Sequence, residues 1–469
     1  MSKRVVIIGG GPAGYEAAFA GTKYGAEVTL IEDQGSGGSA VLYDCVPSKS
    51  LIAATGIRTD LRRADDMGFE YERKGKFLEI GSVNARVRDL ARAQSADVRA
   101  QLESNGARLI SGRGYFKESP TKKNVHAVHV DHADGTEEVI ECELVLIATG
   151  AHPRVLPGAE PDGERILSWR QVYDLQELPE HLIVVGSGVT GAEFVSAFAE
   201  LGLKVTMCAS RDRILPHDDA DAADTLEAVL SERGVHLEKN CRVSSVTRTD
   251  DGGVKVTTQD GREIYGSHAL LTVGSIPNTD GLGLEEVGVE VTKSGHIHVD
   301  RVSRTNISGI YAAGDCTDLF PLASVAGMQG RIAMYHALGE GVDPIRLKTV
   351  ATAVFTRPEI AAVGVTEKQI EEHKVTARIV MLPLNTNARA KMRSIRYGFV
   401  KLFCRRNSGQ IIGGVIVAPN ASELITTVAV AVSNRLTVAD IADCFAVYPT
   451  LSGSITEAAR QLVKHDDLD

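Results

Sequence analysis

The chain has 469 residues, 43% of them hydrophobic and 24% charged, with a formal net charge of −10. This balance is typical of a globular protein of about three domains, and the negative charge argues against a nucleic-acid surface. No apolar run approaches the roughly 18 residues of a membrane span, and the N-terminus lacks the pattern of a secretory signal. The seven cysteines are scattered and odd in number, which predicts neither a disulfide scaffold nor a zinc site and suits a reducing cytoplasm.

The first predicted element is a βαβ unit at residues 4–33, RVVIIGGGPAGYEAAFAGTKYGAEVTLIED. A short strand leads into a G-x-G-x-x-G turn made by Gly9, Gly11 and Gly14, followed by an alanine-rich helix and a second strand. One glycine permits the tight turn, one lets a pyrophosphate approach the backbone, and one lets helix and strand pack closely. The second strand ends at Glu32, where a carboxylate accepts hydrogen bonds from an adenosine ribose. The unit therefore predicts a dinucleotide site.

The next segment, GGSAVLYDCVPSKS at residues 37–50, resembles a redox loop that runs into a helix. It contains one cysteine, Cys45, and one lysine, Lys49. Ala40 stands five residues before Cys45, where a partner thiol would be expected. The loop therefore raises the question of what a single sulfur does there.

Residues 181–210, HLIVVGSGVTGAEFVSAFAELGLKVTMCAS, repeat the pattern of the first unit. The second glycine turn consists of Gly186, Gly188 and Gly191. One such turn is weak evidence, because glycine turns are common in α/β proteins. Two turns, each between a strand and a helix, favour two dinucleotides in one chain.

The two units differ at the end of the second strand. Ala209 occupies the position that corresponds to Glu32, and Ser210 and Arg211 follow it. Without the acid there is no repulsion against a 2′-phosphate, and a nearby arginine could pair with one. The second site is therefore predicted to accept NADPH, with NADH as a further possibility. Arg211 is explained almost equally well as a solvent-facing side chain.

Apolar strands are predicted within LVLIATGA at 144–151, HALLTVGSIPNT at 268–279 and GIYAAGDCT at 309–317. The last of these is followed by Asp315, which either holds a polyol hydroxyl or caps the next helix. From about Asp343 the pattern changes to alternating strands followed by helices, which predicts a separate α+β domain of about 120 residues. The closing KHDDLD is interpreted as a frayed charged tail.

Taken together, these motifs resemble the flavoprotein disulfide reductases, the family of dihydrolipoamide dehydrogenase, glutathione reductase and mercuric reductase. The resemblance covers nearly the whole chain and rests on GGGPAG, PSK, ATG, the second glycine turn, GSIPN, YAAGD, FTRPEIAAVG and PTLSG. It implies an α/β protein with two Rossmann-like dinucleotide-binding domains and a C-terminal α+β dimerisation domain. The implied bounds are 1–150 with 275–345 for the FAD-binding domain, 151–274 for the NAD(P)H-binding domain and 346–469 for the dimerisation domain.

The resemblance also implies cofactor contacts, and no metal. Those in the FAD-binding domain are Gly9, Gly11, Pro12, Ala13, Gly14, Glu32, Gly38, Ser39, Lys49, Gly114, Ala148, Thr149, Gly150, Gly314, Asp315, Leu322, Ala323 and Ser324. Those in the NAD(P)H-binding domain are Gly186, Gly188, Thr190, Gly191, Glu193, Ser210, Arg211 and Gly274. Lys49 is expected near flavin N5 and paired with Glu193, an arrangement that would keep a lysine charged in a poorly solvated site.

The chain departs from the family in the parts that handle a dithiol. Ala40 replaces the first cysteine of the C-x-x-x-x-C loop, so thiol–disulfide exchange cannot run within the loop. Tyr448 and Gly453 stand for the histidine and glutamate of the family's H-P-T-x-x-E dyad, and tyrosine is a poor base near neutral pH. Ser275 stands where many relatives carry arginine, which leaves the nicotinamide contacts open.

The chain therefore keeps the residues for electron transfer from NAD(P)H to FAD and lacks those that pass electrons from FAD to a dithiol. Within the family the chain most resembles the actinobacterial NAD(P)H:quinone reductases that were first named as lipoamide dehydrogenase homologues. We therefore expect a homodimeric flavoenzyme that passes electrons from NAD(P)H through FAD to a quinone, without dihydrolipoamide dehydrogenase activity. The candidate catalytic residues are Cys45, Lys49, Glu193 and Tyr448. Cys45 is equally well explained as a small packing residue, and Tyr448 is better explained as a buried structural tyrosine.

Three alternatives remain at this stage. A soluble pyridine nucleotide transhydrogenase would pass hydride between nucleotides. A disulfide reductase of the dihydrolipoamide dehydrogenase type would reduce lipoamide. A non-enzymatic subunit would bind the nucleotides for structure or sensing.

Overall fold

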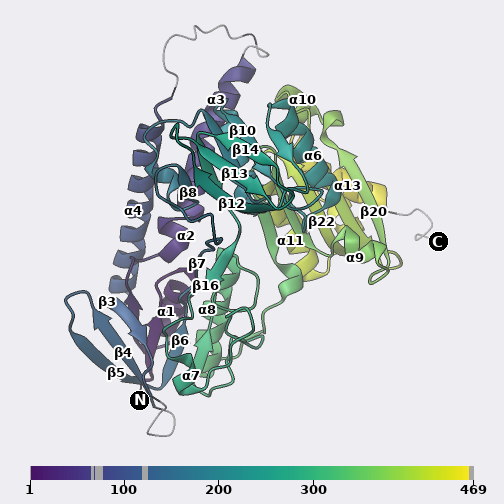
Figure 1. Cartoon of the computed structure of the whole chain (residues 1–469). Helices are drawn as coiled ribbons and strands as arrows, with labels where there is room; N and C mark the ends of the chain where they lie inside the picture. Colours follow the sequence, from purple (N-terminus) through teal and green to yellow (C-terminus); the bar gives the residue numbers. More distant parts are fainter. Residues whose placement is uncertain (1, 65–67, 69–77, 119–124, 464–469) are drawn as a thin grey trace. The chain divides into compact units, whose positions relative to one another are not determined.

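The computed structural model describes residues 2–64, 68, 78–118 and 125–463, so the predicted charged tail lies outside the described residues. The chain divides into two compact units, each assembled from three stretches of sequence. The first unit is Met1–Ser50, Gly81–Arg154 and Gly274–Ile345, and the second is Leu51–Ile80, Val155–Val273 and Arg346–Asp469 (Figure 1). Among the described residues, no helix combines the length and the apolar character that crossing a membrane requires.

A seven-stranded sheet forms the centre of the first unit, in the order β17-β6-β1-β2-β3-β4-β5. Its strands are β1 (Arg4–Ile8), β2 (Glu27–Glu32), β3 (Arg108–Tyr115), β4 (His126–His132), β5 (Glu137–Cys142), β6 (Leu144–Ile147) and β17 (Ile310–Ala312). The strands from β17 to β3 are parallel, and β4 and β5 continue the sheet antiparallel. Because β2 and β6 lie on opposite sides of β1, the carboxyl end of β1 is a point where the strand order reverses, the usual place for a ligand in such sheets.

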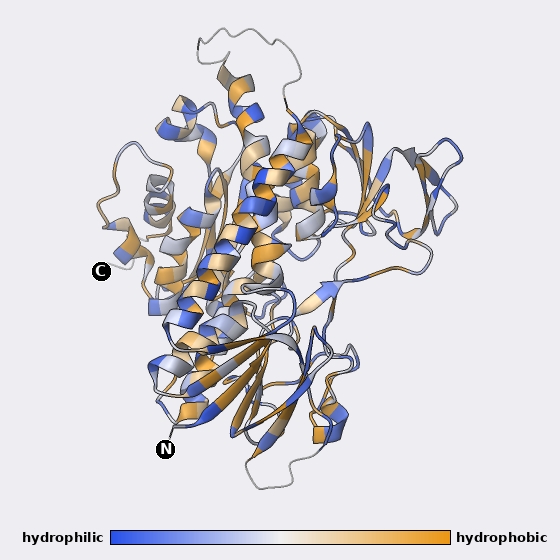
Figure 2. Ribbon diagram, turned by 90° about the vertical axis from the view of Figure 1, so that its left-hand side faces the viewer, coloured by the Kyte–Doolittle hydropathy of each residue, from blue (hydrophilic) through white to orange (hydrophobic). Residues whose placement is uncertain are grey.

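Alternating residues of β1 supply two hydrophobic cores. Val5 and Ile7 belong to the core shared with α1 and α8, whereas Val6 and Ile8 face the opposite core. Strands buried on both faces are expected to be apolar throughout, and in Figure 2 the ribbons of this sheet are largely orange. The helices of this unit are α1 (Pro12–Lys23), α2 (Gly38–Leu42), the start of α3 (Cys45–Ala64), α4 (Ile80–Ser104), α7 (Leu284–Val287) and α8 (Ala323–Leu338). A small antiparallel pair joins β7 (Ala151–Pro153) to β16 (Ser275–Pro277).

The second unit contains a five-stranded parallel sheet in the order β11-β10-β9-β15-β8. Its strands are β8 (Ile166–Ser168), β9 (His181–Val185), β10 (Lys204–Cys208), β11 (His236–Glu238) and β15 (His268–Leu271). They are accompanied by η2 (Val172–Asp174), α5 (Val189–Glu200), α6 (Ala220–Glu232) and an antiparallel sheet of β12 (Val243–Arg248), β13 (Val254–Thr258) and β14 (Glu263–Gly266). The element β9–α5–β10 is the second predicted βαβ unit.

The same unit also holds an antiparallel sheet in the order β18-β19-β22-β21-β20. Its strands are β18 (Ala351–Val354), β19 (Glu359–Gly364), β20 (Ala377–Pro383), β21 (Phe399–Arg405) and β22 (Ile411–Ala418). Around it lie η3 (Leu347–Thr349), α9 (Glu367–Glu371), η4 (Leu384–Thr386), α10 (Ala388–Met392), α11 (Ala421–Asn434), α12 (Val438–Ala442) and α13 (Gly453–Leu462). The predicted fold class, two Rossmann-like sheets with a C-terminal α+β part, is confirmed.

A buried lysine on β21 forms ion pairs with three carboxylates. Lys401 is 1% exposed and pairs with Asp219, Asp221 and Glu367, from the start of α6 and the start of α9. These hydrogen bonds raise the pKa of Lys401 although its burial acts to lower it. A buried charge with this number of partners stays ionised, so the cluster joins three elements of the second unit.

Candidate functional site

The first glycine turn leads from the carboxyl end of β1 into α1. Gly9 has a φ of +108°, and a Cβ there would lie 2.3 Å from the carbonyl oxygen of Ala148. A Cβ on Gly14 would lie 1.9 Å from the Gly9 oxygen, whereas one on Gly11 would meet nothing within 4 Å. Gly9 and Gly14 are therefore needed by the fold, while Gly11 leaves an open approach to a helix N-terminus that no side chain caps. Such an opening fits a phosphate group.

Glu32 ends β2 beside this turn. One of its carboxylate oxygens accepts a hydrogen bond from Gly10 N at 2.6 Å, and the other accepts one from Gln34 N at 2.7 Å. Burial raises the pKa of Glu32, and these two hydrogen bonds oppose the rise. Each carboxylate oxygen keeps a second lone pair, so the group retains the capacity to accept ribose hydroxyls.

The start of α2 lies against the first glycine turn. Gly37 N donates to Gly10 O at 2.8 Å, and a Cβ on Gly38 would lie 2.7 Å from Gly11 Cα. Ser39 follows as the second residue of the helix. The structure therefore brings the predicted contacts Gly38 and Ser39 to the glycine turn, although the two segments are separated in the sequence.

Asp315 lies just past β17, after Gly314 with its φ of +82°. Burial raises the pKa of Asp315 to about 6, and the negative charge of Asp44 adds to this rise. Among the described residues no side-chain or backbone group donates a hydrogen bond to its carboxylate. A largely desolvated carboxylate that lacks a donor fits the hydroxyls of a polyol. Sequence reasoning gave Asp44 no role, and its position directly before Cys45 was the available signal.

The turn after β6 is tied to β16 through an asparagine. Thr149 Oγ1 donates to Asn278 O at 2.7 Å, Asn278 Nδ2 donates to Thr149 O at 2.8 Å, and Asn278 N donates to Gly150 O at 2.9 Å. Gly274 accepts a hydrogen bond from Arg154 N at 2.9 Å. Gly274 falls in the first unit, whereas the other predicted nicotinamide-nucleotide contacts fall in the second.

The remaining predicted FAD contacts are spread over the first unit. Leu322 is the N-cap of α8, and Ala323 and Ser324 are exposed in its first turn. Ala13 is buried at a point where α1 and α8 approach closely. The closeness is such that a Cβ on Gly330 of α8 would lie 2.1 Å from Ala13 O. Gly114 is buried in β3 against side chains of β1 and β2. Pro12 is the first residue of α1.

The single sulfur of the predicted redox loop sits at a helix start. Cys45 is the first residue of α3 and is half-buried, and Lys49 lies one turn farther along the same helix. Ala40 belongs to the preceding helix α2. All seven cysteines lie within the described residues, and none of these is in a disulfide.

The second glycine turn has the same geometry as the first. Gly186 has a φ of +116°, and a Cβ there would lie 2.4 Å from the carbonyl oxygen of Thr272. A Cβ on Gly191 would lie 2.2 Å from Gly186 O, whereas one on Gly188 would meet nothing within 4 Å. Thr190 is half-buried in the first turn of α5, which no side chain caps. This opening also fits a phosphate group.

The strand end that reads the ribose differs between the two units. Ala209 is fully buried, and Ser210 and Arg211 are exposed just beyond it. Within the described part of the chain, no acidic group forms an ion pair with Arg211. The site therefore presents a hydroxyl and a guanidinium where the first site presents a carboxylate.

Glu193 has a structural contact that sequence reasoning missed. Its side chain is buried in α5, and its Oε1 accepts a hydrogen bond from Phe355 N at 2.9 Å. Ser196, one turn later, accepts one from Arg357 N at 3.1 Å. Glu193 thus holds the segment before β19 against α5. Its expected pairing with Lys49 joins residues of different units and stays a prediction.

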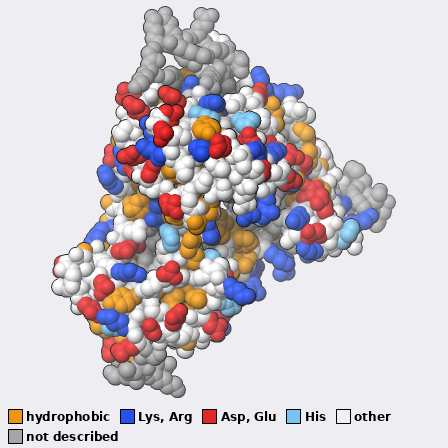
Figure 3. All heavy atoms as spheres, in the orientation of Figure 1, with side chains coloured by type: hydrophobic (Ala, Val, Ile, Leu, Met, Phe, Trp, Pro, Cys, Tyr) orange, Lys and Arg blue, Asp and Glu red, His pale blue; other side chains and the backbone are white. Residues whose placement is uncertain are grey.

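Tyr448 lies in an exposed apolar segment. The relative exposures of Phe445, Val447 and Tyr448 are 105%, 75% and 84%. Large apolar side chains are seldom left in water together, so this segment is a candidate interface. Figure 3 shows one face of the molecule, on which acidic and basic side chains are interspersed.

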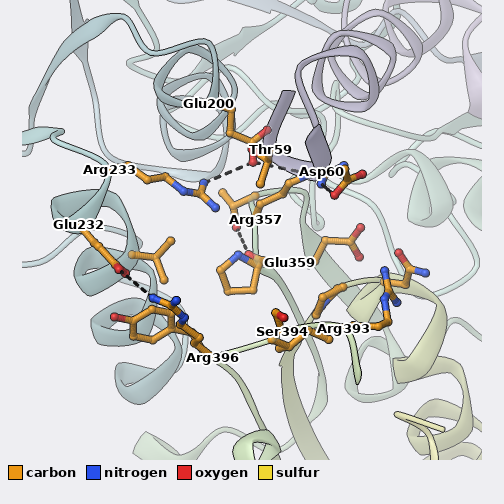
Figure 4. Close-up of a pocket in the computed structure, with 17 residues that line it drawn as sticks. Thr59, Asp60, Glu200, Glu232, Arg233, Arg357, Glu359, Arg393, Ser394 and Arg396 are labelled. Atoms are coloured by element: carbon orange, nitrogen blue, oxygen red, sulfur yellow. Dashed lines mark hydrogen bonds and ion pairs between the residues drawn. The ribbon is translucent and has the colours of Figure 1, made fainter. Parts of the chain in front are cut away.

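The second unit also contains a cavity of about 620 Å³ that the sequence did not suggest (Figure 4). Glu200, 1% exposed, lies 3.4 Å from Arg233 Nη1 and 3.7 Å from Arg357 Nε, and Arg357 also pairs with Asp60 at 3.3 Å. Burial raises the pKa of Glu200, and the two guanidinium groups oppose the rise. Neither glycine turn lines this cavity, so we do not assign the nucleotides to it.

Comparison with known proteins gives consistent matches over the whole chain. Residues 3–330 match the family model of pyridine nucleotide-disulphide oxidoreductases, and residues 350–459 match the dimerisation domain of that family. An NAD(P)H dehydrogenase (quinone) of Mycobacterium tuberculosis is 61% identical, over 100% of this chain and 96% of the relative. A dihydrolipoyl dehydrogenase of Bacillus subtilis is 32% identical over 97% of each chain.

Two solved structures resemble the fold. The crystal structure of LpdA from Mycobacterium tuberculosis has a TM-score of 0.95 and 60% identity, over 98% of this chain and 100% of that one. The HOCl-induced flavoprotein disulfide reductase RclA from Escherichia coli has a TM-score of 0.85 and 25% identity, with the same coverage.

Proposed function

Because this chain belongs to the pyridine nucleotide-disulphide oxidoreductase family, we propose that it is an FAD-dependent NAD(P)H dehydrogenase that reduces quinones. The relative of 61% identity carries the name NAD(P)H dehydrogenase (quinone), and it aligns over this entire chain. At that level of identity the fold and the general chemistry are shared. The argument for the acceptor class comes from this chain's own residues.

The two glycine turns support the binding of two nucleotides. In the first unit, Gly11 leaves the backbone open, Glu32 accepts ribose hydroxyls and Asp315 accepts polyol hydroxyls, so these residues would hold FAD. In the second unit, Gly188 leaves the backbone open and Ser210 and Arg211 would hold the adenosine end of NAD(P)H. When bound, FAD supplies acceptance of hydride from a reduced nicotinamide and release of electrons to an acceptor.

The single observation that supports the proposed acceptor class is that the loop before α3 and the start of α3 contain one cysteine, where a dithiol would need two. Cys45 is half-buried at the helix start, and position 40 is an alanine. A dithiol relay needs an attacking thiolate and a leaving sulfur within reach of each other. Tyr448 also replaces the base that would activate such a thiol, and it lies in the exposed segment with Phe445. An acceptor that needs no thiol, such as a planar quinone, is consistent with these residues.

Anaerobic stopped-flow tests this function. The flavin is reduced with NADPH or NADH and is then mixed with menadione, lipoamide, glutathione disulfide or an oxidised nucleotide analogue. We expect menadione to reoxidise the flavin at least about 100-fold faster than either disulfide, which is about 2.7 kcal/mol in activation free energy. Equal rates with lipoamide would contradict the proposal, and a fastest reaction with the nucleotide analogue would favour a transhydrogenase.

The role of the sulfur is tested separately. In Cys45→Ser the quinone rate is expected to stay within about fivefold of the wild type, because no sulfur relay is required. Cys444→Ser, which removes an exposed thiol elsewhere, is the matched control. A loss of quinone reduction in Cys45→Ser with FAD fully bound would overturn the direct transfer.

We also propose that NADPH is preferred over NADH. The buried Ala209 leaves no carboxylate at the strand end, and the Arg211 guanidinium is exposed beside it. Charge-assisted hydrogen bonds from arginine to phosphate are strong relative to neutral ones. Arg211→Ala is expected to raise the NADPH concentration at half-maximal flavin reduction about fivefold and to leave that of NADH unchanged.

The dimerisation-domain match and the exposed Phe445–Tyr448 segment support a homodimer. Seven cysteines without a disulfide among the described residues support a cytoplasmic location. Sedimentation velocity at micromolar concentration tests the first part, and a Tyr448→Arg variant is expected to shift the distribution toward monomer.

A further inference from the structure

The backbone at the end of β10 is held by the backbone at the end of β11. Ala209 N donates to Glu238 O at 2.8 Å, and Ala209 O accepts a hydrogen bond from Cys241 N at 2.8 Å. Arg211 O accepts one from Asn240 N at 2.9 Å. The nucleotide loop, which we define as the residues from Ala209 to Arg211, therefore takes its position from the segment that follows β11.

Asn240 has an unusual backbone conformation. Its φ is +52°, in the left-handed region that residues other than glycine seldom adopt. Such a conformation persists where the surrounding contacts determine it. Arg262 supplies one of these contacts, because its Nη2 donates to Asn240 O at 3.2 Å. The Asn240 N–H that bonds to Arg211 is therefore oriented in part by Arg262.

The guanidinium of Arg262 connects three acceptor groups. Besides Asn240 O, it reaches a Glu238 carboxylate oxygen, to which its Nη1 donates at 2.8 Å. Its Nε donates to the two oxygens of the Asp260 carboxylate at 3.0 and 3.2 Å. Asp260 lies in the turn between β13 and β14. Because a guanidinium presents its donors in a fixed planar geometry, Arg262 fixes the segment after β11 to this turn.

Arg262 also compensates a negative charge beside the nucleotide loop. Glu238 lies opposite Cys208 in the parallel pairing of β10 with β11, directly before that loop. Paired strands lie about 4.8 Å apart, so an uncompensated carboxylate there would repel a phosphate bound at the loop. Arg262 forms an ion pair with Glu238 and so reduces this repulsion. His236 contacts the same carboxylate at 2.7 Å and carries a charge only when it is protonated.

A separate set of contacts holds the residues that follow the nucleotide loop. Ile214 N donates to Glu227 Oε1 at 3.0 Å. Leu215 N donates to Ser187 O, within the second glycine turn, at 2.8 Å. These hydrogen bonds do not involve Arg262. The second unit is therefore expected to stay folded when Arg262 is replaced, while the nucleotide loop loses part of its support.

We propose that Arg262 is a positioning residue for nucleotide selection, which acts through Asn240 and Glu238. Its bond to Asn240 sets the place of the Arg211 guanidinium that meets a 2′-phosphate, and its ion pair with Glu238 removes a repulsive charge. Both effects act on a phosphate more strongly than on a hydroxyl. Loss of Arg262 therefore weakens binding of a nucleotide with a 2′-phosphate and has little effect on one without it.

The inference rests on the proposed preference for NADPH and does not depend on the electron acceptor. The test titrates NADP⁺ and NAD⁺, neither of which can reduce the flavin, into the FAD-loaded enzyme by calorimetry. In Arg262→Gln we expect NADP⁺ affinity to fall about fivefold and NAD⁺ affinity to change less than about twofold. Adding Glu238→Gln to this variant should restore about twofold of the NADP⁺ affinity, because it removes the uncompensated charge. Arg262→Lys keeps the charge but not the planar fork, so its NADP⁺ affinity should fall only about twofold.

Lys255→Gln is the matched control, because it removes an ion pair with Glu263 at 3.0 Å on the paired strands β13 and β14, and it should leave both affinities at wild-type values. Equal losses of both affinities in Arg262→Gln would show a purely structural role and overturn the proposal, as would an unchanged NADP⁺ affinity. Should Arg262→Gln fail to fold, the same comparison in Arg262→Lys decides, since only a loss confined to NADP⁺ supports the proposal. A wild-type enzyme that binds NAD⁺ more tightly than NADP⁺ would instead contradict the proposed NADPH preference, and the change in NADP⁺ affinity in Arg262→Gln would still decide the role of Arg262.

Discussion

The β1–α1 turn and the β9–α5 turn have the same three-glycine geometry but different surroundings. In both, an added Cβ on the first or third glycine would overlap backbone atoms, while the middle glycine is open. The residues at the ends of the second strands differ. Glu32 places a carboxylate beside the first turn, whereas Ala209 and Arg211 place a methyl group and a guanidinium beside the second. The shared part serves what all dinucleotides have in common, the pyrophosphate. The divergent part decides which nucleotide each unit accepts.

The largest expected effect comes from filling the opening of each turn. Gly11→Ala is expected to reduce FAD affinity at least 100-fold, about 2.7 kcal/mol, because the methyl group occupies the phosphate approach. Gly188→Ala is expected to keep FAD and to raise the NADPH requirement by a similar factor. Flavin content and stopped-flow reduction measure the two effects. Gly341→Ala, where an added Cβ also meets nothing within 4 Å, is the control, and equal losses in all three variants would refute the comparison.

The first site should respond to pH through Asp315, whose pKa of about 6 is above its ordinary value. A raised carboxyl pKa means that the folded apoprotein gains stability from this group below about pH 4 and loses it as the pH rises through 6. The change is about 2–3 kcal/mol. Urea unfolding of the apoprotein between pH 4 and 8 should show it, and Asp315→Asn should remove it. FAD should counteract the loss, because its hydroxyls would stabilise the charged carboxylate. An identical pH profile for wild type and variant would exclude this role.

The second unit should show the opposite sign through His268 on β15. Burial lowers the pKa of His268 to about 4, and the charges of Arg165 and Arg248 add to the effect. A lowered histidine pKa means that stability is fully present above about pH 6.5 and is lost as the pH falls toward 4, by about 2–3 kcal/mol. His268→Gln is expected to flatten this acid dependence, measured by urea unfolding over that range. An unchanged acid dependence in His268→Gln would contradict this role of the buried histidine.

The smallest expected effect comes from making the second strand end resemble the first. Ala209→Glu places a carboxylate at the position that corresponds to Glu32, so NADPH affinity should fall about tenfold, or 1.4 kcal/mol, through repulsion of the 2′-phosphate. NADH affinity should change less than threefold. Binding of NADP⁺ and NAD⁺ by calorimetry measures both, and a thermal melt checks that the buried position tolerates the longer side chain. Equal losses for both nucleotides would show that the strand end does not select between them.

Both βαβ units could be predicted, because the glycine spacing and the apolar strands that identify them lie within about 30 consecutive residues. The departures at Ala40 and Tyr448 were also visible in the sequence alone. The hydrogen bonds that hold residues 209–211 to residues 238–241 were not, since they depend on how the turn before β12 packs on the end of β10. Neither was the hydrogen bond of Glu193 to Phe355 N, which joins α5 to the segment between β18 and β19. Such contacts are set by tertiary packing, which no short-range pattern reports.

The Lys401 cluster constrains how this protein can diverge. Replacing Lys401 alone would leave the negative charges of Asp219, Asp221 and Glu367 close together without their shared cation, which is strongly destabilising. Replacing one acid alone removes one ion pair and leaves Lys401 with two carboxylate partners. Sequences that descend from a common ancestor with this chain should therefore exchange the lysine only together with its acids, so that the four positions covary as a set.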